Sequence, residues 1–286
     1  MQTVHTIPNL RSTVDQWRAR RERVAFVPTM GHLHDGHLQL VKRASRAADR
    51  VVVSIFVNPM QFGANEDFAA YPRTLKQDSL KLAENGVHLL FVPGDEELYP
   101  YGIDDTVRVE VPALSNILCG ASRPGHFTGV ATVVAKLLNA VRPHIALFGE
   151  KDYQQLLVVR RMVEDLCMPI EIIAEPTVRE DDGLAISSRN VYLSPEERIQ
   201  ASTLYRTLQW INGCLASGVR DFDSLAAQGM TMLKESGFHP DYVAIRRAED
   251  LGVPQTTDLK VIILAAAWLG KTRLIDNLVV TLKDEA

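Results

Sequence analysis

Three histidines, His32, His34 and His37, fall within six residues, shortly after a short apolar run at residues 24–27. The run has the β-branched, apolar character of a buried strand, and apolar residues recur at helical spacing after residue 37. His34 and His37 would then lie where that helix begins, and helix N-termini bind anions through backbone N–H groups and the helix dipole. Gly36 lacks the Cβ that would keep a flat adenine ring from the backbone. The stretch predicts a nucleotide phosphate site.

Two further loops carry residues that suit binding. Residues 58–63 follow the apolar run 51–57, and Asn58 and Gln61 offer amides that recognise hydroxyls and carboxylates without adding charge. Taken alone, Asn-Pro is a common way to begin a turn. Residues 149–155 follow another apolar run and contribute Lys151, which suits phosphate charge, although a Lys-Asp pair is usually a solvated surface pair.

A fourth cluster places two hydroxyls and a guanidinium in succession at Ser187, Ser188 and Arg189. Hydroxyls donate neutral hydrogen bonds and arginine offers a charged fork, so the cluster suits the β- and γ-phosphates of a nucleotide. A mobile segment of this composition could close over a triphosphate. The alternative interpretation is a polar turn between domains.

Motifs that would indicate other kinds of binding site are incomplete in this sequence. The histidine run approaches the HxHxDH pattern of metallo-hydrolases, but the aspartate falls one place early, at Asp35, and no cysteine lies near. Residues 270–272 resemble the end of a P-loop, but Ala265 stands where its first glycine is needed. A GxGxxG fingerprint is absent, which removes the main sequence argument for a nicotinamide or flavin cofactor.

Strands and helices alternate over the first part of the chain, which predicts an α/β fold with a Rossmann-like, doubly wound parallel sheet. Ligands of such sheets lie beyond the carboxyl ends of the strands. We therefore expect the loops after residues 27, 57 and 148 to form the site. The predicted strands are residues 24–27, 51–57, 88–92, 145–148 and 170–174, and the predicted helices are residues 38–48, a polar stretch ending near 85, 128–141 and 152–166.

A second, smaller α+β domain is expected after the sheet, because helices are then followed by strands. We predict a first domain over residues 1–183, which binds the ligands, and a C-terminal lid domain over residues 184–286. The elements expected in the second domain are helices at residues 195–215 and 222–235 and strands at 242–246, 261–266 and 278–282.

Composition narrows the class of protein. The 286 residues are 46% hydrophobic and 23% charged, which is typical of a soluble globular protein. A net charge of −4 gives no basic face for a nucleic acid. No apolar run approaches the roughly 18 residues of a membrane-spanning helix, and the N-terminus does not have the pattern of a signal peptide. Three well-separated cysteines indicate reduced thiols, so we expect a cytoplasmic protein without a membrane or nucleic-acid partner.

The motifs, taken in order, resemble those of the pantothenate synthetases, the pantoate:β-alanine ligases of the HIGH-motif nucleotidyl transferase superfamily. The resemblance covers essentially the whole chain. One small departure is Ile186, where the family often has methionine. The motifs are residues 28–31 with His34, Gly36 and His37, residues 58–62, residues 123–127, residues 149–155 and residues 187–190.

The resemblance implies a two-step reaction. Pantoate attacks the α-phosphorus of ATP to give pantoyl adenylate and pyrophosphate, and β-alanine then displaces AMP. The expected partners are pantoate, β-alanine and ATP, with Mg²⁺ bound chiefly to phosphate oxygens and water and no protein ligand named for it. The resemblance also implies a homodimer.

The same resemblance assigns residues by position, with His37 the expected proton donor or transition-state stabiliser. The catalytic set is His37, His34, Lys151, Ser187, Ser188 and Arg189. The ATP-binding set is Met30, Gly31, His34, Gly36, His37, Gly149, Lys151, Asp152, Val178, Ile186, Ser187, Ser188 and Arg189. The substrate-binding set is Pro28, Thr29, Met30, Asn58, Gln61, Arg123, His126 and Gln155.

Two alternatives stay open. A nucleotidyltransferase or class I aminoacyl-tRNA synthetase shares the histidine-glycine turn, but the chain leaves no room for an anticodon-binding domain and has no basic stripe for tRNA. A regulatory protein that only binds ATP could use the same fold. Such a binder has no need of Gln61, Gln155 and the cluster at residues 187–189, and these favour the ligase.

Overall fold

The computed structural model describes residues 1–64 and 66–282 and contains two compact units. The first holds Met1–Glu150 and Gln155–Pro176, and the second holds Lys151–Gln154 and the chain from Thr177 onward. The domain boundary predicted between residues 183 and 184 stays a prediction. The preceding residues 177–183 belong to the second unit, where Arg179 forms a β-bridge with Ala185. No helix in the described part of the chain is long and apolar enough to cross a membrane.

The first unit is built on a parallel sheet of six strands, in the order β1-β4-β3-β2-β5-β6. Its strands are β1 (Gln2–Val4), β2 (Val24–Thr29), β3 (Arg50–Ile55), β4 (Leu89–Phe91), β5 (Ile145–Gly149) and β6 (Glu171–Glu175). All neighbouring pairs are parallel, which confirms the predicted fold class. Since β2 lies between β3 and β5, the loops that follow these three strands leave the same edge of the sheet side by side.

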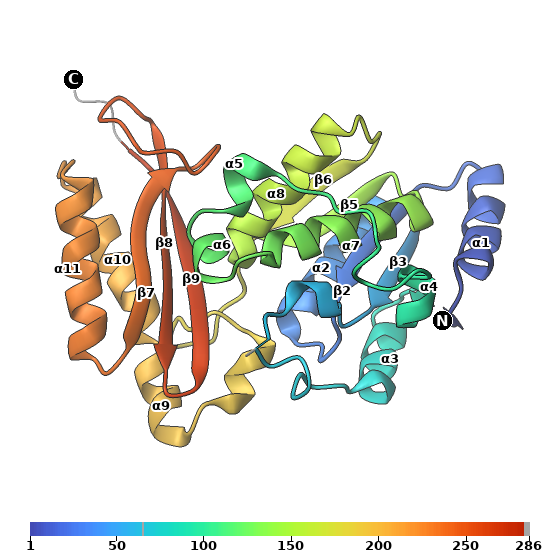
Figure 1. The fold of residues 1–286 in the computed structure, drawn as a ribbon, viewed down its shortest axis with the longest axis horizontal. Helices are drawn as coiled ribbons and strands as arrows, with labels where there is room; N and C mark the ends of the chain where they lie inside the picture. Colours follow the sequence, from blue (N-terminus) through green and yellow to red (C-terminus); the bar gives the residue numbers. More distant parts are fainter. Residues whose placement is uncertain (65, 283–286) are drawn as a thin grey trace. The chain divides into compact units, whose positions relative to one another are not determined.

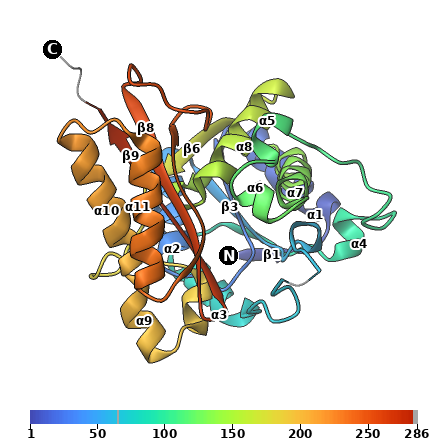
Figure 2. The same ribbon diagram turned by 60° about the vertical axis from the view of Figure 1, so that its left-hand side comes forward.

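Helices cover both faces of this sheet (Figures 1 and 2). On one face α2 and α3 pack against alternate strand residues such as Val27 and Val53. The intervening residues, such as Phe26 and Val52, are also buried and must face the other side, where α1 and α7 pack together. The helices are α1 (Ile7–Ala19), α2 (Asp35–Ala47), α3 (Leu75–Glu84), α7 (His126–Val141) and α8 (Tyr153–Asp165), with short turns η1 (Pro59–Gln61), α4 (Asp95–Leu98), α5 (Pro112–Ser115), α6 (Cys119–Ser122) and η2 (Glu150–Asp152).

The sequence missed α1 although its signals are present. Thr6 caps the helix by accepting a hydrogen bond from the Asn9 N–H at 3.4 Å, and a proline occupies the first turn. Leu10, Val14 and Trp17 are buried at helical spacing. The edge strand β1 has only three residues and gains its pairing from β4, so its own sequence carries little signal.

The second unit is an antiparallel sheet with helices against one face, which confirms the predicted α+β class (Figure 1). Its elements are η3 (Ser188–Tyr192), α9 (Pro195–Ala201), α10 (Thr203–Ala216), α11 (Phe222–Glu235), β7 (His239–Arg247), β8 (Lys260–Leu269) and β9 (Thr272–Thr281). The single helix predicted over residues 195–215 is wrong, because it breaks at Ser202. The Ser202 hydroxyl binds the Ile199 carbonyl at 3.2 Å and so competes with the helical backbone.

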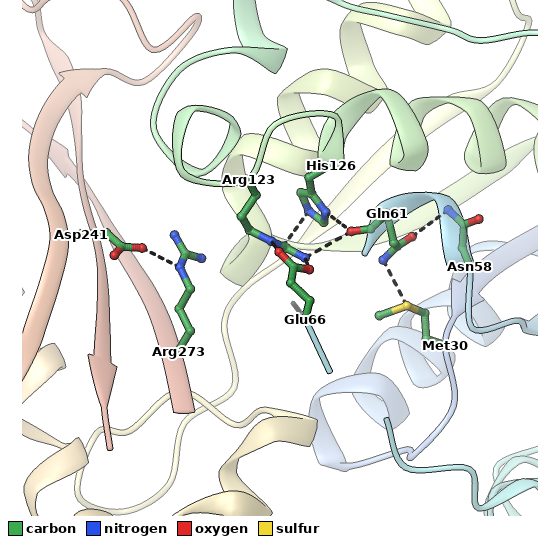
Figure 3. Close-up of polar contacts among 8 residues, drawn as sticks. All are labelled: Met30, Asn58, Gln61, Glu66, Arg123, His126, Asp241 and Arg273. Carbon is green, nitrogen blue, oxygen red and sulfur yellow. Dashed lines mark hydrogen bonds and ion pairs between the residues drawn. The ribbon is translucent and has the colours of Figure 1, made fainter. Parts of the chain in front are cut away.

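Strand β9 begins six residues earlier than predicted, because it pairs with β8 along its whole length from Thr272. The two intervening residues, Gly270 and Lys271, form the hairpin turn, with Gly270 at φ +56°. This turn contains the incomplete P-loop motif. Across the sheet, Arg273 Nε donates to Asp241 Oδ2 at 2.7 Å and links the two outer strands (Figure 3).

Two histidines secure the amino ends of the central parallel strands. His88 Nδ1 accepts a hydrogen bond from the Val51 N–H at 3.1 Å, and His144 Nδ1 accepts one from the Val24 N–H at 3.0 Å. Burial lowers the pKa of both imidazoles, with Arg50 adding to the effect at His88 and Arg18 at His144. Both rings must be neutral to accept these bonds.

We therefore expect the protein to lose stability as the pH falls through 6.5, the usual histidine value. Below it the unfolded chain takes up protons that the folded rings resist, so the contribution present at pH 7.5 is lost on acidification. Each of these hydrogen bonds contributes about 1 kcal/mol to the free energy of unfolding. Urea unfolding at pH 7.5 and 5.5 measures it. The double variant His88→Asn, His144→Asn keeps an acceptor that does not titrate, and an equally steep pH profile in that variant would refute the assignment.

Candidate functional site

The turn after β2 is held by a carboxylate that the sequence did not single out. Asp78 of α3 is 1% exposed and accepts the N–H groups of His32 at 2.9 Å and Leu33 at 2.8 Å. Lys81, one helical turn further, donates to the Leu33 carbonyl at 2.6 Å. Gly31 has φ +84°, a left-handed conformation that favours glycine. The histidine turn is therefore fixed by α3 before any ligand arrives.

His34 and His37 lie at the start of α2, as predicted. His34 is the N-cap residue, and its carbonyl accepts the His37 N–H at 2.9 Å. His37 Nδ1 in turn accepts the His34 N–H at 3.4 Å, and the ring centroids lie 4.1 Å apart. Because Nδ1 acts as the acceptor, a neutral His37 carries its proton on Nε2. The pair thus combines a helix N-terminus with an imidazole donor, an arrangement that suits an anion.

Gly36 has a role beyond the one inferred from the sequence. A Cβ at this position would lie 3.0 Å from both Cε1 and Nδ1 of His34. The missing side chain therefore leaves room for the half-buried His34 ring over the first turn of α2. Glycine at position 36 therefore permits the observed orientation of the His34 ring, independently of any ligand.

The turn after β3 meets the turn after β2 through its amides. Asn58 Nδ2 donates to Gln61 Oε1 at 3.1 Å, and Gln61 Nε2 contacts Met30 Sδ at 3.1 Å (Figure 3). Thr29 supports the same region, since its buried hydroxyl donates to the Ser54 carbonyl at 2.8 Å and accepts the Gly31 N–H at 3.2 Å. Side-chain contacts thus join Met30, Asn58 and Gln61 of the predicted substrate-binding set, Thr29 lies next to them in the chain, and Pro28 lies half-buried at the end of β2.

Arg123 and His126 contact the backbone of Gln61. Arg123 Nη2 donates to the Gln61 carbonyl at 3.2 Å, and His126 Nδ1 lies 2.8 Å from the same oxygen (Figure 3). Arg123 also forms an ion pair with Glu66. Burial raises the pKa of the Glu66 carboxyl, but the hydrogen bonds and charge of Arg123 outweigh it and hold that pKa below its usual value. In this structure the two residues position Gln61; their direct contact with substrate stays a prediction.

Helix α7 packs directly on the η1 turn through Gly129, which the sequence did not indicate. A Cβ there would lie 2.2 Å from the Met60 carbonyl oxygen and 2.8 Å from the Gln61 nitrogen. Both are backbone atoms and have no flexible side chain to move. Only glycine therefore allows this helix to approach the loop that carries Gln61.

Gly129→Ala is expected to lower the free energy of unfolding by about 1–3 kcal/mol, the cost of overpacking a fitted contact. Gly213→Ala in α10 is the matched control, because a Cβ there meets nothing within 4 Å. That helical substitution should be neutral or stabilise by up to about 1 kcal/mol. Urea unfolding of the two variants measures the difference, and equal stability would show that the α7 contact tolerates a Cβ.

The loop after β5 continues through η2 into α8. Gly149 ends the strand, and Gln155 is half-buried in the first turn of the helix. Lys151 and the exposed Asp152 belong to the second unit, where Asn277 of β9 donates to the Lys151 carbonyl at 2.8 Å. A residue 126 positions away in the sequence therefore fixes the backbone that carries the predicted phosphate lysine.

The second unit brings Val178 next to the serine cluster. The Ile186 N–H donates to the Val178 carbonyl at 3.0 Å, and the Ser187 hydroxyl accepts the Arg189 N–H at 3.3 Å at the start of η3. Ser188 is buried, whereas Ser187 and Arg189 are half-buried. This region is therefore an ordered turn capped by its own serine, and its contact with phosphates stays a prediction.

Asp276 of β9 anchors the segment that leads into this turn, through Arg179. Its carboxylate accepts two hydrogen bonds from Arg179, at 2.6 and 2.9 Å, and Arg179 also donates to the Gly183 carbonyl. The Asp276 side chain is 2% exposed, and the Arg179 guanidinium lies 3.7 Å from the centroid of the Tyr205 ring. Arg179 and Asp276 were absent from the predicted site. They are positioning residues for the segment that carries Val178.

The described part of the chain offers no protein cage for a metal ion. Among residues 1–64 and 66–282, no group of three or more histidine, cysteine, aspartate or glutamate side chains is placed to hold one.

Comparisons with known proteins all indicate the same family. A family model described as pantoate-beta-alanine ligase matches residues 2–279. The pantothenate synthetase of Pseudomonas putida (strain GB-1) is 56% identical over 285 residues, covering 100% of this chain and 99% of that protein. The pantothenate synthetase of Thioalkalivibrio sulfidiphilus (strain HL-EbGR7) is 55% identical over 282 residues, covering 99% of each chain.

Solved structures agree with the sequence relatives. The pantothenate synthetase of Thermus thermophilus is similar with a TM-score of 0.91 and 50% identity, covering 97% of this chain and 99% of that one. The pantoate-beta-alanine ligase of Francisella tularensis, solved in complex with beta-gamma ATP and β-alanine, has a TM-score of 0.80 and 35% identity, covering 97% of each chain. The family model, the sequence relatives and the solved structures together show that this chain belongs to the pantoate-β-alanine ligase family.

Proposed function

We propose that this chain is an ATP-dependent ligase that condenses pantoate with β-alanine through a pantoyl adenylate. The observation that carries the proposal is the contact between Gln61 and Met30, at 3.1 Å from Nε2 to Sδ. It joins the amide-bearing turn after β3 to the turn that leads into the histidines. The two turns, which are proposed to bind an anion and a small polar acid, thus adjoin at the carboxyl edge of one sheet.

The proposed chemistry proceeds in two displacements. A pantoate carboxylate oxygen attacks the α-phosphorus of ATP, and the bond to the β-phosphate oxygen breaks to release pyrophosphate. The β-alanine amine then attacks the acyl carbon of the adenylate, AMP leaves, and the nitrogen loses a proton as the amide forms. No covalent enzyme intermediate is needed, so positioning and charge stabilisation carry the catalysis.

Each predicted ATP residue has a proposed contact. His34 and His37 bind phosphate oxygens, and Lys151, Ser187, Ser188 and Arg189 neutralise or donate to the phosphates. The nucleoside is framed by Met30, Gly31, Gly36, Gly149, Asp152, Val178 and Ile186. The hydrogen bond from Ile186 to Val178 supports a shared role for these two residues.

Pantoate is proposed to lie against Gln61 and Gln155, whose amides hold its hydroxyls or carboxylate. Pro28 and Met30 shape an apolar surface for its gem-dimethyl group, while Thr29, Asn58, Arg123 and His126 complete this side. The hydrogen bonds of Arg123 and His126 to the Gln61 carbonyl support this arrangement. The Francisella tularensis relative solved with β-alanine supports the second substrate.

Mg²⁺ is proposed to arrive with ATP, held by phosphate oxygens and water. Among the described residues, no group of three or more histidine, cysteine, aspartate or glutamate side chains is placed to hold a metal ion, and no protein ligand is named for Mg²⁺. We further propose a cytoplasmic homodimer, whose mass light scattering would report.

Labelled pyrophosphate exchange tests the function directly. The protein should exchange pyrophosphate into ATP when pantoate is supplied, without β-alanine, and should not exchange it when pantoate is omitted. Intact ATP binding with no pantoate-dependent exchange would reject the ligase and favour an ATP-binding regulator. Exchange supported equally by unrelated acids would reject pantoate as the substrate.

A further inference from the structure

The side-chain amide of Asn58 has a fixed orientation. Its Oδ1 accepts the Met60 N–H at 3.3 Å, and its Nδ2 donates to the Gly129 carbonyl at 3.1 Å. A backbone N–H can only donate and a carbonyl can only accept, so these two groups determine which end of the amide is oxygen. Asn58 is 1% exposed, and a reversed amide would face both backbone groups with the wrong partner.

Tyr99 supplies the second hydrogen bond to Asn58 Oδ1, at 2.6 Å, and must therefore donate it. The residue directly follows α4 and is 3% exposed. Its ring lies 6.2 Å from that of Phe56, and Lys136 Nζ lies 5.3 Å from the Tyr99 ring centroid. Burial, together with the charge of Asp95, raises the pKa of the phenol, so the hydroxyl keeps its proton.

These hydrogen bonds also fix the orientation of the Gln61 side-chain amide. The second hydrogen of Asn58 Nδ2 goes to Gln61 Oε1 at 3.1 Å, which occupies the oxygen end of the Gln61 amide. Gln61 Nε2 is then the end that reaches Met30 Sδ, a weak acceptor (Figure 3). The chain of bonds makes Gln61 a donor toward its ligand.

We propose that Tyr99 is a positioning residue of the reaction, which holds Asn58 so that Gln61 presents its N–H groups to an oxygen of the acid substrate. The inference rests on the proposed function, because it assumes that Gln61 binds pantoate. It adds the polarity of that contact: the substrate atom opposite Gln61 is an acceptor, a carboxylate or hydroxyl oxygen. Tyr99 itself touches no substrate.

Tyr99→Phe removes the hydroxyl and keeps the ring. The KM for pantoate should rise about tenfold or more, while the dissociation constant of a non-hydrolysable ATP analogue stays within about twofold, because uniform substrate binding appears in KM. Tyr101→Phe is the matched control: Tyr101 is two residues further and 83% exposed, and both constants should match the wild type. An unchanged pantoate KM in Tyr99→Phe would overturn the proposal.

A double-mutant cycle distinguishes positioning from general destabilisation. If Tyr99 acts through Gln61, adding Tyr99→Phe to Gln61→Ala should change kcat/KM for pantoate by less than about twofold, because the path is already broken. If Tyr99→Phe lowered kcat/KM for pantoate in the Gln61→Ala variant as much as it does in the wild type, the proposal would be overturned. Pyrophosphate exchange by the wild type is measured first. If the wild type shows no pantoate-dependent exchange, this result rejects the proposed function, whereas the role of Tyr99 is judged from the variants.

A second variant tests the polarity of the contact without touching Tyr99. Gln61→Glu leaves an oxygen to accept from Asn58 but replaces the donor by a carboxylate, which repels a pantoate oxygen. The KM for pantoate should rise by at least about a hundredfold with ATP-analogue binding retained. Pantoate binding as tight as in the wild type would show that Gln61 need not donate, and would overturn the inference.

Discussion

Replacing His37 with alanine is expected to lower kcat by roughly two to four orders of magnitude, the range for loss of a general acid or of a group that stabilises transition-state charge. The structure adds one detail: His37 Nδ1 accepts the His34 N–H, so a neutral His37 carries on Nε2 the proton that is proposed to act on a phosphate oxygen. Steady-state kinetics at saturating ATP, pantoate and β-alanine measure kcat.

Two further variants are needed to interpret this loss of kcat. His239→Ala, at an exposed position of β7, should leave kcat unchanged and controls for histidine loss in general. His37→Gln keeps a donor but cannot transfer a proton. Activity at least tenfold above His37→Ala would assign the effect to hydrogen bonding, whereas equal activity would assign it to proton transfer. A near-normal kcat in His37→Ala would contradict the role of His37 altogether.

Arg179→Ala is expected to cost about 3–5 kcal/mol of unfolding free energy, as when one partner of a buried ion pair is removed. The Asp276 side chain is 2% exposed, and its carboxylate would lose both hydrogen bonds from the guanidinium. Burial raises the pKa of the Asp276 carboxyl, and Arg179 opposes that rise. Without Arg179 the folded protein favours the protonated acid, so the variant should become less stable as the pH rises from 5 to 8.

Urea unfolding of the wild type and variant at both pH values measures this loss. Arg247→Ala is the matched control in the same unit, because the Arg247–Asp250 pair is 36% and 54% exposed. Such a pair contributes at most about 1 kcal/mol. A loss no larger for Arg179→Ala than for this control would mean that the buried pair contributes little to stability.

The sequence predicted much of the fold, including the loops that are proposed to form the site, for physical reasons that are local. Strands buried on both faces of a parallel sheet must be continuously apolar, so β2, β3 and β5 were recognisable from single runs of residues. Their loops were correctly expected at one edge, since parallel strands share a carboxyl end. The helix start at His34 was visible in the change from strand to helical spacing.

The residues that hold the site in place were not visible. Asp78 lies in a polar helical stretch and reads as solvated surface, yet it binds the turn 46 positions earlier in the sequence. Gly129 reads as an unfavourable residue in a helix until the Met60 carbonyl is seen against it. Asn277 reads as one more polar residue of a strand, although it binds Lys151.

The sequence by itself therefore determined the fold class, the loops that form the edge of the sheet and the residue types that suit a nucleotide and a polar acid. Only the tertiary structure decided how those residues are aimed. It fixed the tautomer of His37, the orientation of the Asn58 and Gln61 amides and the donor role of Tyr99. The physical reason is that periodicity and turn chemistry act over a few residues, whereas the direction of a hydrogen bond depends on partners brought together from distant parts of the chain.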